Sequence, residues 1–317
     1  MAPVIEVEGL VKRYRKATSN AVDCISFAVD QGHLFALLGP NGAGKTTTIS
    51  ILTTTLSATA GRVCIAGLDV AREAAAVRSQ VGIIFQRPSL DLNLSAEQNI
   101  RFHAVLYGLY PFRFTFGSMP HAYRQQVMDL AAVLGLSNDI GKPVKTFSGG
   151  MLRKLEIIRS LIHRPRVLFL DEPTLGLDPA SRRNLWEYLR DVRHQSGTTT
   201  FLTTHYLEEA EQAASICIMS KGRIVARGTP TELRSALVED YLLVDANDRS
   251  ALRCELQALG VCFSERPQFR IPVESAGVHR LLKSIETPLT MVQVHTPTLE
   301  DAYLAIVDRD EHVESDA

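Results

Sequence analysis

Short apolar or alternating runs, separated by turn residues, recur along the chain and predict strands. Three continuous apolar runs, Leu34–Leu38, Val81–Phe85 and Val167–Leu170, are typical of parallel strands that are buried on both faces. Further strands are predicted at Ile5–Leu10, Val22–Val29, Arg62–Gly67 and Thr199–Leu202, with a hairpin at Ile216–Met219 and Ile224–Arg227. Helical segments between the strands favour an α/β fold built on a parallel sheet.

Apolar residues at three- and four-residue spacing predict these helices. They cover Thr46–Leu56, two stretches within Leu94–Leu136, the segment from Leu152 to Leu161, and Ser181–Val192. The stretches within Leu94–Leu136 are separated by the run LYPFRFTFGSMP, where Pro111 and Pro120 exclude a continuous helix. We expect its aromatic residues to pack beneath a loop or short hairpin, and a contact surface for a partner is the alternative; they are Phe112, Phe114 and Phe116.

The pattern changes near residue 235, which predicts a domain of residues 1–234 and a second one of residues 235–317. The second has strand patterns at Tyr241–Val244, Phe269–Val273 and Leu289–Val294, and helical patterns at Arg249–Leu259 and Gly277–Ile285. This order predicts a compact α+β accessory domain. A last helix is expected to begin after Thr298 as its cap, and the acidic end DRDEHVESDA is expected to be disordered.

Composition limits the classes of protein and partner. The 317 residues include 34 basic and 35 acidic ones, so no overall charge favours nucleic acid or an anionic membrane. The cysteines show no C-x-x-C spacing, and we expect core thiols in a reducing compartment rather than disulfides or zinc; they are Cys24, Cys64, Cys217, Cys254 and Cys262. No secretory leader and no apolar run of spanning length is recognised, so we expect any membrane part to be a separate chain.

The stretch GPNGAGKTT follows the predicted buried strand Leu34–Leu38 and precedes a predicted helix. Its glycines can turn backbone N–H groups toward phosphate oxygens, Lys45 adds a positive charge, and Thr46 adds a hydroxyl for Mg²⁺. The sequence therefore predicts a phosphate loop for a nucleoside triphosphate. The loop comprises Gly39, Pro40, Asn41, Gly42, Ala43, Gly44, Lys45, Thr46 and Thr47.

A second cluster follows in FSGGMLRKLEIIRSLIHRPRVLFLDEPTLGLDP. Ser148, Gly149 and Gly150 precede a helix and form a second candidate anion site, which indicates a nucleotide shared between two copies of the chain. Asp171 and Glu172 end a predicted strand at the edge where the phosphates are expected. Asp171 is the candidate Mg²⁺ residue and Glu172 the candidate general base.

Three residues complete the candidate site. Gln86 and His205 each follow a predicted strand, so Gln86 can reach Mg²⁺ or an attacking water and His205 can donate a hydrogen bond to the terminal phosphate. Tyr14 can stack on a base, although an amphipathic edge residue is the alternative.

In this order and context, Tyr14, GPNGAGKTT, Gln86, FSGGM, VLFLDE, GLD and His205 resemble the ATP-binding subunits of ATP-binding-cassette (ABC) transporters. The resemblance implies a P-loop NTPase with a RecA-like core, an antiparallel β subdomain and a helical subdomain near residues 92–165. It implies that Tyr14 stacks on adenine, Gln86 senses the γ-phosphate, and Asp178 communicates across a homodimer holding two MgATP. Phe147 and Met151 replace the residues that usually flank SGG in this family.

The stretches SLDLNLSAEQNIRFHAVLYG, FSGGMLRKLE and PTLEDAYLAIV resemble the ABC-2 class of drug-resistance and nodulation-factor exporters. This resemblance implies hydrolysis of ATP that drives a separate permease of about six helical spans, with the chain held peripherally at the cytoplasmic face of the plasma (inner) membrane. The cargo is expected to be a drug, a lipid or a polysaccharide. Alternatives are an importer, a sodium or copper-maturation system, a soluble ATPase acting on ribosomes or DNA, and a regulatory module without turnover.

Overall fold

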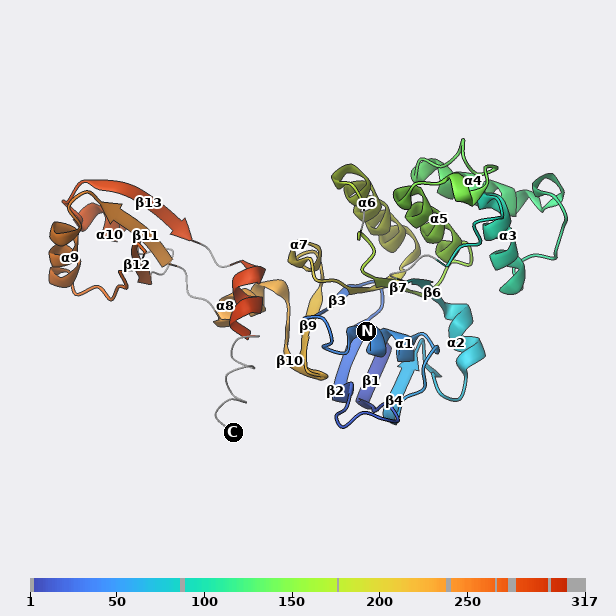
Figure 1. Cartoon of the computed structure of the whole chain (residues 1–317), viewed down its shortest axis with the longest axis horizontal. Coiled ribbons are helices and arrows are strands. Elements are labelled where there is room, and N and C mark those ends of the chain that lie inside the picture. Colours follow the sequence, from blue (N-terminus) through green and yellow to red (C-terminus); the bar gives the residue numbers. More distant parts are fainter. Residues whose placement is uncertain are drawn as a thin grey trace. The chain divides into compact units, whose positions relative to one another are not determined.

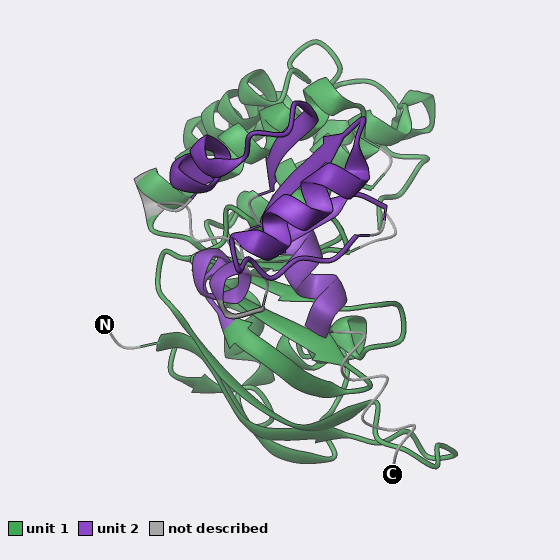
Figure 2. Cartoon of the chain, turned by 90° about the vertical axis from the view of Figure 1, so that its left-hand side faces the viewer, with its two compact units in different colours: residues 1–227 green, residues 228–317 purple. Residues whose placement is uncertain are grey.

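The computed structural model describes residues 3–85, 89–175, 177–237, 241–265, 267–272, 278–295 and 298–306. The chain divides into two compact units, Met1–Arg227 and Gly228–Ala317 (Figure 2). The boundary expected after residue 234 falls within α8 (Pro230–Leu237). The predictions for Gln86 and for the acidic end of the chain lie outside the described residues.

A six-stranded sheet with the order β10-β9-β3-β8-β7-β6 organises the first unit. Its strands are β3 (Leu34–Leu38), β6 (Val81–Ile84), β7 (Val167–Asp171), β8 (Thr199–Thr203), β9 (Ser215–Ser220) and β10 (Arg223–Gly228). The pairs β6–β7, β7–β8, β3–β8 and β3–β9 are parallel. Every residue of β3 and β7 is buried, which confirms the prediction from two of the three continuous apolar runs, whereas Ile83 of β6 is only partly buried.

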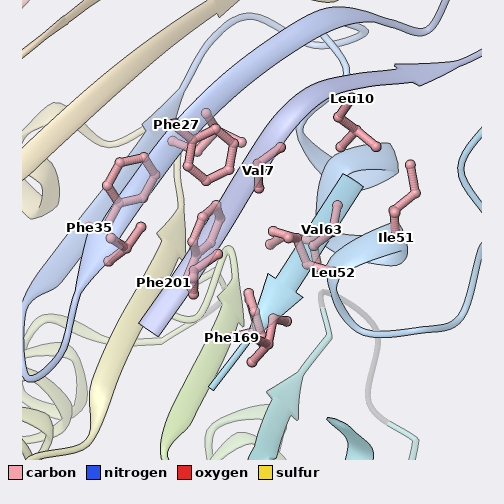
Figure 3. Packing of buried hydrophobic residues seen from close by; sticks show 14 of the residues in the cluster. Val7, Leu10, Phe27, Phe35, Ile51, Leu52, Val63, Phe169 and Phe201 are labelled. Carbon is pink, nitrogen blue, oxygen red and sulfur yellow. The ribbon is translucent and has the colours of Figure 1, made fainter. Parts of the chain in front are cut away.

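A second, antiparallel sheet has the order β2-β1-β4-β5. Its strands are β1 (Pro3–Lys12), β2 (Val22–Asp30), β4 (Ala60–Ile65) and β5 (Leu68–Asp69). The core of the unit lies between the two sheets, where the rings of Phe27, Phe35, Phe169 and Phe201 pack with centroids 5.0–6.0 Å apart (Figure 3). Such aromatic pairs contribute about 0.5–1.5 kcal/mol each beyond their buried area, so they fix the parallel strands against the antiparallel sheet.

Helices α3, α4, α5 and α6 lie on the opposite side of the six-stranded sheet from the antiparallel sheet (Figure 1). The helices of the unit are α1 (Lys45–Leu52), α2 (Ala74–Gln80), α3 (Ala96–Leu106), α4 (His121–Val133), α5 (Gly149–Leu161), α6 (Pro179–Ser196) and α7 (Leu207–Ala210), with 3-10 turns η1 (Phe116–Ser118) and η2 (Val144–Thr146). Helix α1 ends before the predicted Leu56. Thr53 donates its hydroxyl hydrogen bond to the carbonyl of Ile49, and Thr54 adopts a φ of 62° that ends the helix.

The aromatic loop between α3 and α4 corrects one prediction. Phe114 is 87% exposed and Phe112 is 46% exposed, so these rings do not pack beneath the loop. Only Phe116 packs inward, edge-on against the buried Tyr123. The spacing of aromatic residues in a loop carries no information about which face they present, and this is why the prediction failed.

The second unit contains the predicted α+β pattern. A sheet of order β12-β11-β13 is formed by β11 (Tyr241–Ala246), β12 (Phe269–Pro272) and β13 (Leu289–His295), all antiparallel. Helices α9 (Arg249–Ala258) and α10 (Val278–Ser284) supply apolar side chains to its core. Thr298 accepts a hydrogen bond from the Asp301 N–H before a helical segment at 299–306, as predicted for a cap.

The burial of the cysteines corrects a further prediction. All five thiols are free, but only Cys64 and Cys217 are buried, whereas Cys24, Cys254 and Cys262 are exposed. The expectation of core thiols is therefore wrong for three of the five.

Within the described part of the chain, no helix has both the length and the apolar character needed to cross a bilayer.

Candidate functional site

The parallel strands bring the phosphate loop, the Asp171–Glu172 pair and His205 to one edge of the sheet. Leu37 and Asp171 both pair with Thr203, from opposite sides of β8. The phosphate loop begins after β3, Asp171 is the last residue of β7, and His205 follows β8 closely. Residues that are far apart in the sequence therefore converge at the carboxyl ends of three neighbouring strands, where α/β folds bind their ligands.

Glycine is required in the phosphate loop for two physical reasons. Gly44 has a φ of 104° and precedes α1 as its N-cap, and Gly39 has a φ of 154°. A Cβ atom at Gly44 would lie 2.4 Å from the carbonyl oxygen of Ala21, and one at Gly39 would lie 2.3 Å from that of Met219. The backbone is thus packed directly against its neighbours, and helix α1 begins at the loop with its first N–H groups, which favour an anion.

We expect Gly44→Ala to lower the thermal unfolding temperature and to weaken binding of a nucleoside triphosphate, because the new methyl group displaces either the loop or the strand entry at Ala21. Gly42→Ala is the matched control. Gly42 has a φ of 84° but no atom within 4 Å of the added Cβ, so it introduces backbone strain of about 1–3 kcal/mol without the clash. Thermal unfolding and equilibrium nucleotide binding of both variants check this, and equal losses would contradict it.

Lys45 is 7% exposed at the start of α1. Its ammonium group donates to the carbonyl oxygens of Gly39 at 2.6 Å and Pro40 at 3.0 Å. Burial lowers the pKa of Lys45, while the negative charges of Glu172 and Asp171 oppose that shift. The ammonium is therefore held inside the loop and facing the acidic pair, where a phosphate oxygen can compete with the two carbonyls for its protons.

Asp171 is buried, and its carboxylate accepts a 2.5 Å hydrogen bond from the Thr203 hydroxyl. Burial raises the pKa of this carboxyl, an effect that the Thr203 hydrogen bond partly offsets. Thr46, the other described candidate for Mg²⁺, is exposed in the first turn of α1. A carboxylate and a hydroxyl oxygen are hard ligands of the kind that Mg²⁺ takes together with phosphate oxygens and water, so these residues fit the ion.

Glu172 and His205 contact each other. His205 Nδ1 lies 3.1 Å from Glu172 Oε1, and the Glu172 side chain is 12% exposed. Glu172 has a φ of 49°, an uncommon conformation for a residue with a side chain. Its N–H donates to the Thr203 carbonyl at 3.0 Å, so the left-handed turn is held against β8 with its carboxylate beside the histidine.

Glu209 is a site residue that the sequence analysis missed. Its side chain is buried in α7 and accepts hydrogen bonds from the hydroxyls of Thr174 and Thr204. These threonines belong to the segment after Glu172 and to the segment before His205, so Glu209 joins the two. Glu208, Glu209 and Glu211 are indistinguishable by sequence pattern alone, and no signal in the sequence singles out the buried one.

Ser148, Asp178 and Tyr14 are further described residues that the sequence predicted for the site. Ser148 caps α5, accepting from the Met151 N–H at 3.3 Å, as the sequence predicted. Asp178 caps α6 through the N–H and hydroxyl of Ser181, and these hydrogen bonds lower its pKa. The Tyr14 hydroxyl lies 3.3 Å from that of Thr47, which puts the ring beside the phosphate loop. Among the described residues, no hydrogen bond or ion pair joins Ser148 to the loop.

Comparison with known proteins assigns the family. The sequence profile described as ABC transporter matches residues 22–175. The daunorubicin resistance ATP-binding protein DrrA3 of Streptomyces coeruleorubidus is 36% identical over 99% of this chain and 98% of its own length. The chain belongs to the ABC transporter family. The Nod factor export ATP-binding protein I of Ralstonia nicotianae is also 36% identical, over 97% of this chain and 95% of its own length.

Solved structures agree with this ABC transporter assignment. The ATP-binding subunit of an ABC transporter superposes with a TM-score of 0.65 at 30% identity, covering 74% of this chain and 92% of that one. The predicted fold class, a P-loop NTPase with a parallel core and an antiparallel sheet, is confirmed. As a member of the family this chain is an ATPase whose hydrolysis is coupled to transport, and its relatives are ATP-binding subunits of the ABC-2 exporter type.

Proposed function

We propose that two copies of this chain bind two MgATP between them and drive a separate membrane permease that exports its cargo. The observation that carries the catalytic part is the convergence of Lys45, Asp171, Glu172 and His205 at one sheet edge. A buried cation for the phosphates, a buried carboxylate for the metal and a partly exposed carboxylate beside a histidine are the parts that phosphoryl transfer to water requires.

In this proposal the loop Gly39–Thr47 holds the phosphates, Thr46 and Asp171 hold Mg²⁺, and Tyr14 stacks on the base. The ion neutralises charge on the phosphate oxygens when bound. Glu172 accepts a proton from the attacking water, and Gln86, outside the described residues, is proposed to contact the ion or that water. The exposed start of α5, with Ser148, Gly149 and Gly150, binds the nucleotide of the second copy, and Asp178 lies at that interface.

The contact between His205 and Glu172 constrains the histidine's role. A neutral imidazole carries one N–H, so donation from Nδ1 to the Glu172 carboxylate leaves Nε2 without a proton. Donation from Nε2 to a phosphate oxygen then needs a protonated ring or a broken contact with Glu172. We infer that His205 orients the Glu172 carboxylate before it braces the γ-phosphate, because a neutral imidazole has only one N–H proton for the two anions.

The names of the relatives support export. DrrA3 is described by daunorubicin resistance and the Ralstonia protein by Nod factor export. We therefore propose a drug, a lipid or a polysaccharide-like molecule as cargo, a permease of about six helical spans, and a peripheral position at the cytoplasmic face of the plasma (inner) membrane. The names of the relatives give no support to the alternatives, an importer or a soluble ATPase acting on ribosomes or DNA.

Co-purification tests this proposal. Tagged Glu172→Gln protein, which we expect to bind ATP without turnover, is isolated with MgATP from detergent-solubilised native membranes. We expect a polytopic protein in a one-to-one ratio with the chain, together with two copies of the chain. Lys45→Ala, handled identically, should recover the permease without a nucleotide-dependent dimer. Recovery of ribosomes or nucleic acid in place of a membrane protein would refute the transport proposal and leave the ATPase assignment intact.

A further inference from the structure

Helix α5 carries a buried arginine that the proposed mechanism does not use. Arg153 is 5% exposed and lies one turn after Ser148. Its side chain reaches from the helix to the end of β7 and the turn after it, residues 171–173, which we call the catalytic turn. Every N–H group of the guanidinium has an acceptor. The acceptors are the carbonyls of Phe85, Asp171, Glu172 and Pro173 and the carboxylate of Glu156.

The pattern of these hydrogen bonds matches the shape of a guanidinium. Nε donates to Pro173 at 2.8 Å, and Nη2 donates to Asp171 at 3.1 Å and Glu172 at 3.0 Å. Nη1 donates to the carbonyl of Phe85 and to Glu156. Five donors in a planar fork therefore meet five acceptors, whereas lysine has only three donors on one atom and cannot reproduce this arrangement.

The acceptors belong to backbone whose position decides where the site residues point. Three consecutive carbonyls of the catalytic turn are held, including that of Glu172, whose φ of 49° is uncommon for a residue with a side chain. From the other side, Glu172 N–H is held by Thr203 of β8. A residue kept in a sparsely populated conformation persists where its surroundings over-determine it, and the hydrogen bond from Arg153 to the Glu172 carbonyl is one of those contacts.

The same helix also fixes the strand next to the turn. Phe85, which accepts from Arg153, follows β6, and β6 is the parallel neighbour of β7. Glu156 Oε1 accepts from the Ser89 N–H at 2.9 Å, and Arg159 donates to the Ser89 carbonyl at 2.7 Å. The helix that begins at Ser148 is thus bonded to the catalytic turn and to the backbone at Phe85 and Ser89.

We propose that Arg153 is a positioning residue for ATP hydrolysis, which fixes the catalytic turn to helix α5 and so places the Glu172 carboxylate. This rests on the proposed role of Glu172 as the base. Arg153 contacts neither the phosphate loop nor Lys45 among the described residues. Its loss should therefore reduce turnover while nucleotide binding persists, a combination that general loss of folding does not produce.

Two variants of the full-length chain test the proposal. Arg153→Met leaves the Glu156 carboxylate buried without its main cation, so its unfolding temperature should fall. Arg153→Met/Glu156→Gln removes that charge but keeps an amide oxygen for Ser89, and should recover part of the stability. In both, we expect kcat to fall by about 10- to 100-fold with KM for ATP changed less than threefold, since displacement of about 1 Å costs that much.

Arg101→Met is the matched control. Arg101 is equally buried and pairs with Glu97 at 3.3 Å, but it lies in α3 and its other contact is the carbonyl of Arg113. This variant should lose stability and keep kcat per folded molecule. The proposal would be overturned if the double variant recovered turnover together with stability. It would also be overturned if KM for ATP rose in proportion to the loss of kcat.

Glu172→Gln, measured in the same assay, separates the two assignments. If Glu172→Gln loses turnover and the double variant keeps the wild-type kcat, the positioning role of Arg153 is refuted. The assignment of Glu172 as the base then stands. If Glu172→Gln keeps wild-type turnover, the assignment of Glu172 as the general base is refuted. The proposal that Arg153 acts by placing the Glu172 carboxylate is then refuted as well. Loss in both, with KM retained, supports the proposal.

Discussion

Replacing Glu172 by glutamine should lower kcat for ATP hydrolysis by about 10²–10⁴-fold, the range expected when a general base is removed. The amide keeps an oxygen that can accept the hydrogen bond from His205 Nδ1, so the arrangement of the turn should persist. The lost property is the capacity to take a proton from water. Affinity for MgATP should stay within about threefold, because the phosphate loop and Lys45 are unchanged.

Phosphate release under saturating MgATP measures the first quantity, and equilibrium binding of ATP measures the second. Glu208→Gln is the control, because Glu208 is an exposed acid in α7, a few residues after His205. It removes the same charge near the site and should leave kcat unchanged. Retained turnover in Glu172→Gln, or equal losses in both variants, would show that Glu172 does not serve as the base.

The sequence predicted those parts of the site that depend on local pattern. Leu34–Leu38 is a fully buried strand with the predicted bounds, and Gly44 adopts the left-handed conformation that a glycine loop implies. Parallel pairing then brings Asp171 to the same edge, which follows from the strand order alone. Strongly apolar strands and glycine-dependent turns can be predicted from local sequence, because few other backbone conformations bury the same residues.

Contacts between distant segments could not be predicted. Arg153 reads as one more polar residue of an amphipathic helix, yet it binds backbone carbonyls up to 68 residues away in sequence. Glu209 looks like its acidic neighbours but is buried between two threonines. Backbone carbonyls carry no residue identity, so nothing in the sequence marks which of them a buried side chain will contact.

The prediction that Phe112 and Phe114 pack beneath the loop failed for a related reason. Their ring centroids lie 5.3 Å apart, and Phe112 stacks on Phe102 at 6.0 Å, so the aromatic residues pack on one another at the surface. The loop is held by Phe116, which packs edge-on against Tyr123, and by Arg101, which donates to the Arg113 carbonyl at 3.0 Å. A partly buried polar contact therefore adds to the apolar anchoring that composition suggested.

Replacing Lys45 by alanine should weaken binding of MgATP by about 10- to 150-fold, the equivalent of losing a hydrogen bond from a charged donor worth about 1.5–3 kcal/mol. Turnover should fall at least as far, because the same ammonium faces Asp171 and Glu172 and balances their charge. Lys142→Ala is the control, since Lys142 pairs with Asp139 at the surface and its removal should leave binding unchanged. Wild-type affinity in Lys45→Ala would refute the phosphate-loop assignment.

The pH dependence of binding gives an independent test of the same residue. Only the protonated amine binds a phosphate oxygen, and burial lowers the pKa of Lys45 below its ordinary value of 10.5. Affinity for MgATP should therefore begin to decline at a lower alkaline pH than an exposed lysine would give, and remain constant below that range. Lys45→Ala should lack this decline, because no other described residue donates an ammonium inside the loop. If the affinity of Lys45→Ala for MgATP still declined at alkaline pH, the titrating group would be another residue. The assignment of Lys45 to phosphate binding would then be refuted.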